Sequence, residues 1–283
     1  MTGHIDLHTH STRSDGTLSP SALVDLAARR RLAAIAITDH DTMAGVAEAL
    51  QRGKENGVEV LAGIEVSSTY QTTAIHILGY GLDHNHPTLA DFLAKLQQAR
   101  HQRNEAMLAR LHSLNIPITA EELAHTAGDQ IGRPHFARLL VAKGYAKNSQ
   151  EAFATYLKRG GAAFVEHIKP DADEVIARIT EAGGLAMLAH PASTDPSLKT
   201  IPALVEALAA IGLAGLEAYY PTHSNTTRRL LLEIAATHRL LPCGGTDFHG
   251  KGYSAAPLGG SPKTMRVPNS VWHSIRERLD SQR

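Results

Sequence analysis

The chain has little of several residue types, and each shortage excludes a class of protein. Cys243 is the sole cysteine among 283 residues, so no disulfide can form within the chain. Lys plus Arg and Asp plus Glu number 28 each, which disfavours non-specific binding to long nucleic acid. No apolar run approaches the roughly 20 residues of a membrane-spanning helix, and no signal-peptide pattern is visible. We expect a cytoplasmic protein that binds no membrane and no long nucleic acid, and we predict no protein partner.

Histidine, by contrast, is abundant. The chain has 17 histidines, whereas Phe, Trp and Tyr together make up only 5% of it. Imidazole is the commonest metal ligand among side chains, so this excess favours a metal site. The 43% of hydrophobic and 20% of charged residues are typical of a globular protein. The length is compatible with one large domain that carries an insertion, or with two domains.

Short apolar runs rich in Ile, Val, Leu and Ala alternate with helical patterns. Ser19 is placed to cap a helix that begins at Pro20, and Asn56-Gly57 marks a turn after the next helical stretch. This alternation predicts parallel βαβ units. Seven strands suggest an α/β barrel, with a doubly wound sheet as the alternative. The predicted strands are 4–9, 34–38, 58–66, 74–80, 185–189, 213–219 and 240–245.

The pattern becomes mainly helical from about residue 88 to residue 160. We predict that residues 1–99 and 169–283 form the two parts of a barrel. Residues 100–168 would then be an inserted helical subdomain that binds substrate or covers the barrel mouth. The tail "VPNSVWHSIRERLD" predicts a closing helix.

Potential metal ligands occur at or near the C-terminal end of each apolar run. Residues i and i+2 of a strand point to one face, which pairs His8 with His10 and Asp247 with His249. In parallel α/β folds, active sites lie at the edge where the strands end. Each residue alone could be an ordinary polar residue between strand and loop, but nine together indicate a shared site. They are His8, His10, Asp15, His40, Glu65, His76, His190, Asp247 and His249.

Six imidazoles and three carboxylates suit borderline divalent ions such as Mn²⁺, Zn²⁺ or Fe²⁺ better than they suit Mg²⁺. They exceed the needs of one ion, so we expect two or three metals that share a bridging carboxylate. Such ions lower the pKa of a bridging water, and the resulting hydroxide can attack a phosphate ester whose charge the metals neutralise.

Several motifs together resemble the polymerase and histidinol phosphatase (PHP) family: "DLHTHSTRSDG", "ITDHDT", "GIEVS", "IHILGYG", "AHP" and "GTDFHG". The resemblance implies a distorted seven-stranded (β/α) barrel with a trinuclear metal centre, Mn²⁺ being favoured, that hydrolyses phosphate esters. One metal would be held by His8, His10 and Asp247. Glu65 would bridge to a second metal that His76 and His190 also bind. Asp15, His40 and His249 would hold the third.

Two further stretches could bind the substrate. In "IGRPHFARLLV", Arg133 and His135 lie where a helix begins, and a helix N-terminus with a guanidinium is a natural anion site. In "AYYPTHSNTTRRLLLEIA", His223 could approach the reacting phosphate. We expect catalysis to involve Asp15, Glu65, His190 and His223. We expect substrate contacts from Ser11, Arg13, Arg133, His135, Asn225 and Arg228.

The combination of "GRPHFAR" and "YYPTHS" resembles one branch of the PHP family. Its members hydrolyse the 3′-phosphate of nucleoside 3′,5′-bisphosphates, and related members trim short oligonucleotides from the 5′ end. The expected substrate is therefore a nucleotide or a short oligonucleotide. The alternatives are histidinol phosphatase or another phosphomonoesterase, an amidohydrolase that cleaves C–N bonds, and a metal-binding module without turnover.

Overall fold

One seven-stranded sheet forms the centre of the molecule. The computed structural model describes residues 3–126, 130–166, 168–262 and 264–282. Each strand is hydrogen-bonded to the strand that follows it in the sequence. All seven predicted strands are present, with bounds that differ by a few residues. They are β1 (His4–Asp6), β2 (Leu32–Ile37), β3 (Glu59–Tyr70), β4 (Thr73–Tyr80), β5 (Leu185–Leu188), β6 (Gly215–Tyr219) and β7 (Leu241–Gly244).

The helices begin and end at the signals present in the sequence. The Ser19 hydroxyl accepts a hydrogen bond from the Ala22 N–H at the start of the first helix. Gly57 ends the second helix with a φ of 66°, a left-handed conformation that glycine adopts without a steric cost. The helices are α1 (Pro20–Arg29), α2 (Val46–Asn56), α3 (Pro87–Ser113), α4 (Ala120–Thr126), α5 (Arg133–Ala142), α6 (Ser149–Ala152), the π-helix η1 (Phe153–Leu157), α7 (Ala172–Glu181), α8 (Pro191–Thr194), α9 (Ile201–Ala210), α10 (Asn225–Thr237) and α11 (Asn269–Asp280).

The fourth strand departs from the predicted parallel arrangement. β4 runs antiparallel to both β3 and β5, whereas the other neighbouring strands are parallel. Only Gln71 and Thr72 join β3 to β4, and a parallel crossover needs about a dozen residues or more. The prediction of parallel βαβ units throughout is therefore wrong at β4. His76 lies in the first half of its strand, yet it pairs with Ser67 near the end of β3, so the reversal brings it to the same edge.

The two edge strands approach each other just beyond their ends. β1 and β7 stand at opposite ends of the strand order. Nevertheless, the Leu7 N–H donates to the Gly244 carbonyl (3.2 Å), and the His10 N–H donates to the Phe248 carbonyl (2.9 Å). A parallel bridge also joins Thr9 to Phe248. The sheet thus curls in the manner of a distorted barrel, and the segments that follow β1 and β7 lie side by side.

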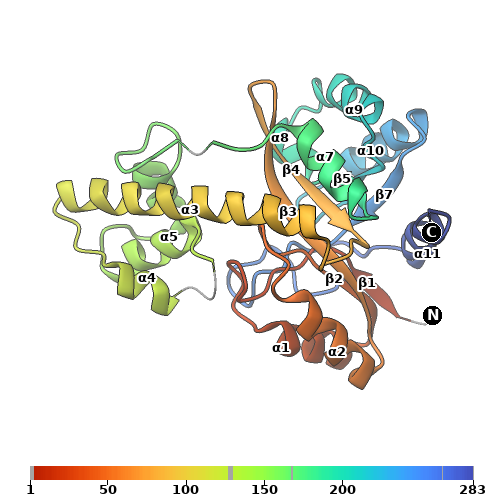
Figure 1. Cartoon of the computed structure of the whole chain (residues 1–283), viewed down its shortest axis with the longest axis horizontal. Helices are drawn as coiled ribbons and strands as arrows, with labels where there is room; N and C mark the ends of the chain where they lie inside the picture. The colour runs from red at the N-terminus through yellow and green to blue at the C-terminus, as the bar shows by residue number, and fades with distance from the viewer. Residues whose placement is uncertain (1–2, 127–129, 167, 263, 283) are drawn as a thin grey trace.

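Alternate residues of the strands face different cores. In β2, Ala34 and Ala36 belong to the cluster inside the curled sheet, whereas Ile35 and Ile37 pack with residues of α1 and α2. The predicted closing helix is α11, which contributes Trp272 to the inner cluster and lies beside the N-terminal strand (Figure 1). The alternation of residues along β2 therefore accounts for the two cores that lie on its two faces.

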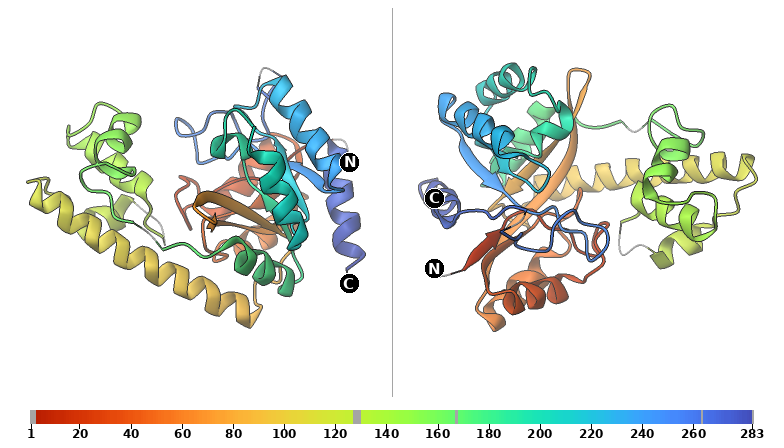
Figure 2. Two further views of the ribbon diagram at one scale, coloured as in Figure 1. Left: turned by 90° about the horizontal axis from the view of Figure 1, so that it is seen from above. Right: turned by 180° about the vertical axis from the view of Figure 1, so that it is seen from behind.

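A long helix, α3, joins the sheet to a second group of helices (Figures 1 and 2). Its first half packs against the sheet through residues such as Leu89 and Leu96. Its second half packs through Met107 and Leu111 against α4, α5, α6 and η1, in a separate core. We term residues 100–126 and 130–166 the helical lobe; residue 100 lies inside α3, between the two cores. None of the helices in the described part of the chain is long and apolar enough to cross a membrane.

Candidate metal centre and anion site

The carboxylate of Glu65 lies at the centre of a cluster at the carboxyl edge of the sheet. Glu65 belongs to β3, whereas His8 and His10 follow β1, and His40 follows β2. The Glu65 Oε2 atom lies 3.2 Å from His8 Nε2 and 3.3 Å from His10 Nε2. His40 Nδ1 lies 3.2 Å from the same oxygen. Three imidazoles from two strand ends therefore surround one carboxylate oxygen.

The second carboxylate oxygen of Glu65 faces two more histidines. His76 Nδ1 lies 2.8 Å from Oε1, and His190 Nε2 lies 2.9 Å from it. His190 follows β5 and has a φ of 28°, a backbone conformation that costs an L-residue energy. Its N–H donates to the buried Glu217 carboxylate (2.8 Å), and this contact stabilises the strained backbone.

Asp247 and Asp15 extend the cluster. Asp247 Oδ1 lies 3.1 Å from His10 Nε2. Asp15 Oδ1 lies 3.1 Å from His249 Nε2, and its Oδ2 lies 3.8 Å from His40 Nε2. The nine predicted ligands thus form one connected group. Among the described residues, three sets have ligand atoms within 4.8 Å of one another: His8, His10, Glu65 and Asp247; His10, Asp15, His40 and His249; and His40, Glu65 and His76.

The donor atoms fit a metal centre. In the described part of the chain, buried ring nitrogens of His8 (Nε2), His10 (both), His40 (Nδ1) and His190 (Nδ1) have no hydrogen-bond partner. A buried polar group without a partner costs about 1–3 kcal/mol, and a cation bound at the nitrogens that face Glu65, such as His8 Nε2 and His40 Nδ1, would remove that cost there. Imidazole nitrogens with carboxylate oxygens are also the donor set of borderline divalent ions. The cluster could therefore hold divalent metal ions.

Burial and charge oppose each other in this cluster. Burial lowers the pKa of His8, but Glu217 and Glu65 outweigh it and raise that pKa well above its usual value. Burial raises the pKa of Glu65, but His40 and His8 outweigh it and hold that pKa well below its usual range. At His40, burial dominates and lowers the pKa to about 4. Glu65 is thus ionised and His40 neutral near pH 7, the states in which both can bind a metal.

Sequence reasoning missed Glu217, a buried carboxylate on β6. Its Oε1 accepts a hydrogen bond from His8 Nδ1 (3.0 Å). This contact fixes the orientation of the His8 ring and directs Nε2 toward Glu65. The signal was present in the sequence, because "LAGLEAY" places a carboxylate inside an otherwise apolar strand, where a charged residue needs a partner.

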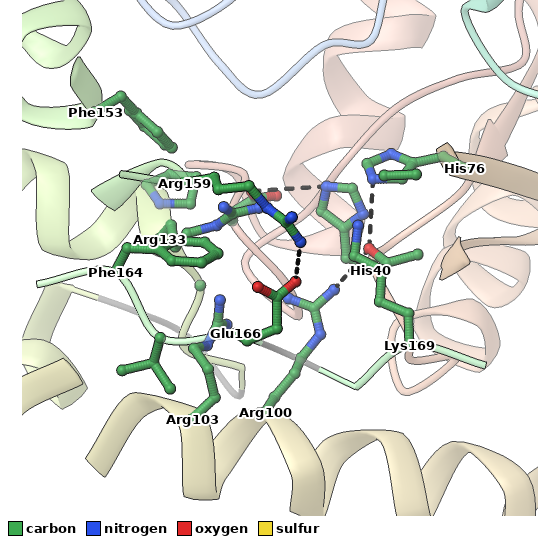
Figure 3. Close-up of a pocket in the computed structure, with 16 residues that line it drawn as sticks. His40, His76, Arg100, Arg103, Arg133, Phe153, Arg159, Phe164, Glu166 and Lys169 are labelled. Carbon is green, nitrogen blue, oxygen red and sulfur yellow. Dashed lines mark hydrogen bonds and ion pairs between the residues drawn. The ribbon is translucent and has the colours of Figure 1, made fainter. Parts of the chain in front are cut away.

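A cavity of about 360 Å³ opens beside the cluster (Figure 3). Asp15, His40 and His76 form part of its wall, so it reaches the candidate metal centre directly. The rest of the wall is rich in cationic side chains, so we term it the cationic cavity. These side chains are Arg100 and Arg103 from α3, Arg133 from α5, Arg159 and Lys169. The sequence predicted Arg133 alone among them.

The cations of this cavity are only partly neutralised by protein carboxylates. Arg100 Nε donates to Asp41 Oδ2 (2.5 Å). Arg103 is only 6% exposed, and within the described residues its Nε and Nη2 atoms have no hydrogen-bond partner. Burial, together with Arg100 and Arg133, lowers the pKa of Arg103 to about 9. Arg159 Nη2 pairs with Glu166 Oε1 (2.5 Å), which also lines the cavity. Arg103, a buried cation with free donors beside other cations, is the feature typical of an anion site.

Two predicted substrate residues, in the loop after β1, are held by protein contacts. The Ser11 hydroxyl donates to Asp39 Oδ2 (2.6 Å), and its N–H donates to Asp39 Oδ1 (2.7 Å). Arg13 pairs with Glu48, at 3.1 Å between Nη2 and Oε2. These contacts fix the loop that leads to Asp15.

Three other predicted substrate residues belong to helices. His135, near the start of α5, is buried, and its Nδ1 accepts a hydrogen bond from the Gly132 N–H (2.9 Å). Burial lowers the pKa of His135 to about 4, so the ring is neutral near pH 7. Asn225 is exposed and Arg228 half-buried at the start of α10, where Arg228 Nη2 donates to the side-chain oxygen Oδ1 of Asn225 (2.5 Å).

His223 lies next to the cluster rather than within it. Its ring centroid is 5.2 Å from that of Tyr220, whose hydroxyl donates to Asp247 Oδ2 (2.8 Å). His223 Nδ1 donates to the Ala218 carbonyl (3.0 Å). In the described structure its buried Nε2 has no hydrogen-bond partner. The ring therefore presents an acceptor nitrogen near the cluster.

Comparison with known proteins places this chain in a family. A family model described as "PHP domain" matches residues 6–169. The 3′,5′-nucleoside bisphosphate phosphatase of Chromobacterium violaceum is 32% identical over 278 residues, 98% of each chain. The 5′-3′ exoribonuclease Rnm of Escherichia coli is 36% identical over 247 residues, 86% of this chain and 84% of the relative. One similar solved structure is that of an amidohydrolase from Chromobacterium violaceum, with bound sulfate and no metal. It matches with a TM-score of 0.87 and 33% identity, and the match covers 98% of this chain and 97% of that chain. The chain therefore belongs to the PHP domain family.

Proposed function

We propose that this chain is a metal-dependent phosphoesterase that removes the 3′-phosphate of nucleoside 3′,5′-bisphosphates, such as adenosine 3′,5′-bisphosphate. The observation that carries the proposal is the cationic cavity, whose five Arg and Lys side chains lie directly beside the histidine–carboxylate cluster. A substrate with two phosphates can place one at each. The activity named for the Chromobacterium relative supports the same substrate class.

Residues of the cluster would hold two or three divalent ions, with Mn²⁺ favoured over Zn²⁺ or Fe²⁺. The proposed assignment is His8, His10 and Asp247 for one ion, Glu65, His76 and His190 for another, and Asp15, His40 and His249 for the third. When bound, such ions polarise the phosphate ester and lower the pKa of a water molecule. Glu217 supports the assignment because it fixes the direction in which His8 presents Nε2.

The cationic cavity would hold the phosphate that does not react. Arg103 offers guanidinium donors without a partner in the described structure, and Arg133 lies in the first turn of α5. Because this phosphate is far from the bond that breaks, its binding energy positions the 3′-phosphate at the cluster. We propose that the helical lobe, which supplies both arginines, is the substrate-binding subdomain.

Side chains of this chain would also control protons at the site. Burial raises the pKa of Asp15, but His40 and His249 outweigh it and hold that pKa well below its usual value, so Asp15 stays ionised. Burial lowers the pKa of His223, and its Nδ1 proton is directed to the Ala218 carbonyl. We assign to His223 Nε2 the role of an acceptor for a proton or a hydrogen bond from the reacting groups.

Steady-state kinetics on matched substrates tests this function. With Mn²⁺-loaded protein, kcat/KM for adenosine 3′,5′-bisphosphate should exceed that for adenosine 3′-monophosphate by about tenfold or more, since one charge-assisted contact is worth about 1.5–3 kcal/mol. Equal values, or a preference for histidinol phosphate, would instead identify another phosphomonoesterase. Hydrolysis of amides or lactams without phosphate release would identify an amidohydrolase.

A further inference from the structure

Ser67 lies where the cationic cavity meets the candidate metal centre. It belongs to β3, two residues after Glu65, and it lines the cavity beside His76 and Arg100, whose side chains both point into the cavity (Figure 3). The Ser67 Oγ atom lies 3.4 Å from His76 Nε2 and 3.3 Å from Arg100 Nη2, and it forms a hydrogen bond with each. One hydroxyl therefore contacts both a predicted metal ligand and a cation of the anion site.

Asp41 holds Ser67 and Arg100 together. Its Oδ1 atom accepts a hydrogen bond from the Ser67 N–H (3.1 Å), and its Oδ2 atom accepts one from Arg100 Nε (2.5 Å). Asp41 is buried and has a φ of 52°, which is uncommon for a residue other than glycine. Its N–H donates to the Glu65 carbonyl (3.0 Å), and its carbonyl accepts from Gln97 Nε2 (3.2 Å). These bonds fix the place at which α3 meets β3.

The single proton of the hydroxyl limits what Ser67 can do. A hydroxyl donates one hydrogen bond and accepts up to two. A guanidinium can only donate, so the contact with Arg100 uses one acceptor position of the Ser67 oxygen. The Ser67 proton can then serve either His76 Nε2 or a group inside the cavity, but not both.

The tautomer of His76 decides between these two acceptors. His76 Nδ1 faces Glu65 Oε1 at 2.8 Å, and a neutral imidazole carries its proton on one nitrogen only. While Nδ1 donates to Glu65, Nε2 is an acceptor and takes the Ser67 proton. When Nδ1 is a metal ligand, the ring proton is on Nε2, which then donates to Ser67 Oγ. The Ser67 proton is thereby free to point into the cavity.

We infer that Ser67 is a positioning residue that couples the cationic cavity to the metal centre: metal binding at His76 directs the Ser67 hydroxyl to the phosphate in the cavity, and that phosphate in turn favours metal binding at His76. The inference rests on the proposed function and adds to it a dependence of each ligand on the other. Each ligand must tighten the binding of the other by the same factor. A hydrogen bond to a charged group makes this factor roughly tenfold or more.

Calorimetric titration with adenosine 5′-monophosphate tests the coupling without a measurement of turnover. The Kd of this nucleotide for metal-free protein, divided by its Kd for Mn²⁺-saturated protein, is the coupling factor. In the wild type it should be about tenfold or more. Ser67→Ala should reduce it by about tenfold, because the donor to the phosphate is lost. Ser67→Thr should keep the wild-type factor, because the hydroxyl remains.

Ser68→Ala is the matched control. Ser68 follows Ser67 in β3, and successive side chains of a strand point to opposite faces. Its hydroxyl donates to the Pro170 carbonyl (3.0 Å). The coupling factor should therefore stay at the wild-type value. An equal fall in Ser67→Ala and Ser68→Ala would show a general loosening of the strand and would overturn the inference.

Hydrolysis of adenosine 3′,5′-bisphosphate by the same wild-type sample separates this inference from the proposed function. If the bisphosphate is hydrolysed, a wild-type coupling factor of one would overturn the coupling alone, and no variant is needed for that result. A factor that Ser67→Ala leaves unchanged would do the same. A wild type that neither binds adenosine 5′-monophosphate nor hydrolyses the bisphosphate would remove the proposed function and the coupling together.

Discussion

The histidine–carboxylate cluster and the cationic cavity share Asp15, His40 and His76, yet they are built differently. Backbone pairing places the cluster. A parallel β-bridge joins His40 to Glu65, and the segments that follow β1 and β7 are hydrogen-bonded to each other. Side-chain packing places the cavity, whose four arginines all come from the helical lobe. We propose from this difference that the sheet determines the reaction, whereas the lobe selects the substrate.

The largest effect is expected at Asp15, where the two regions meet. Asp15→Asn removes a charged group proposed as a metal ligand, so metal content and turnover should fall together. The fall should exceed the roughly 10- to 100-fold that loss of an outer partner of a metal ligand costs. Metal analysis alongside kcat measures both quantities. Asp25→Asn is the matched control, because Asp25 pairs with Arg52 away from the cluster. Full metal content with unchanged turnover would exclude Asp15 from the site.

A smaller effect is expected at Glu217, which orients a residue of the cluster but is not one of the nine predicted ligands. Glu217→Gln keeps the shape of the side chain and removes the charge that orients His8, so the Mn²⁺ concentration for half-maximal activity should rise about 10- to 100-fold. Excess Mn²⁺ should restore much of the activity. Glu233→Gln, on the exposed part of α10, is the control. An unchanged Mn²⁺ requirement would remove Glu217 from this positioning role.

A substitution in the cationic cavity should change KM rather than metal content. Arg133→Ala should raise KM for adenosine 3′,5′-bisphosphate about tenfold or more, because a charge-assisted contact to the non-reacting phosphate is lost. The KM for adenosine 3′-monophosphate should change much less. Arg229→Ala tests the loss of an exposed arginine that pairs with Glu233. A similar rise in KM for both substrates would contradict the separation of the two regions.

The smallest effect concerns stability and has the opposite sign. Arg103→Met removes a buried cation without a hydrogen-bond partner at Nε and Nη2 in the described structure, so the free energy of unfolding should rise by about 1 kcal/mol. Thermal unfolding in a buffer without phosphate or sulfate measures this as a rise in Tm of a few degrees. A fall in Tm would show that Arg103 is stabilised by the folded chain itself.

The cluster could be predicted because its signals are local. A strand reveals which residues share a face, so His8 and His10 could be paired from their spacing, as could Asp247 and His249. Reasoning from local pattern fails at His76, because it does not predict that β4 runs antiparallel to its neighbours. The direction of β4 depends on the two-residue connection after β3, and the apolar run alone does not contain that information.

The cavity could be predicted only in part. Arg133 was found because a helix begins beside it, whereas Arg103 lies within a long helix whose neighbours depend on the packing of the lobe. Arg103 and Arg229 are both helical arginines in the sequence, but one is buried at the cavity and the other is exposed. Tertiary packing, not local pattern, makes that distinction.

The most direct test of the central claim is the identity of the product formed from adenosine 3′,5′-bisphosphate by Mn²⁺-loaded protein. If the cluster cleaves the 3′-phosphate while the cavity holds the 5′-phosphate, the products are 5′-AMP and inorganic phosphate, formed with a kcat/KM of about 10⁴–10⁸ M⁻¹s⁻¹. Formation of 3′-AMP, or no phosphate release where a generic aryl phosphate is hydrolysed, would contradict the account.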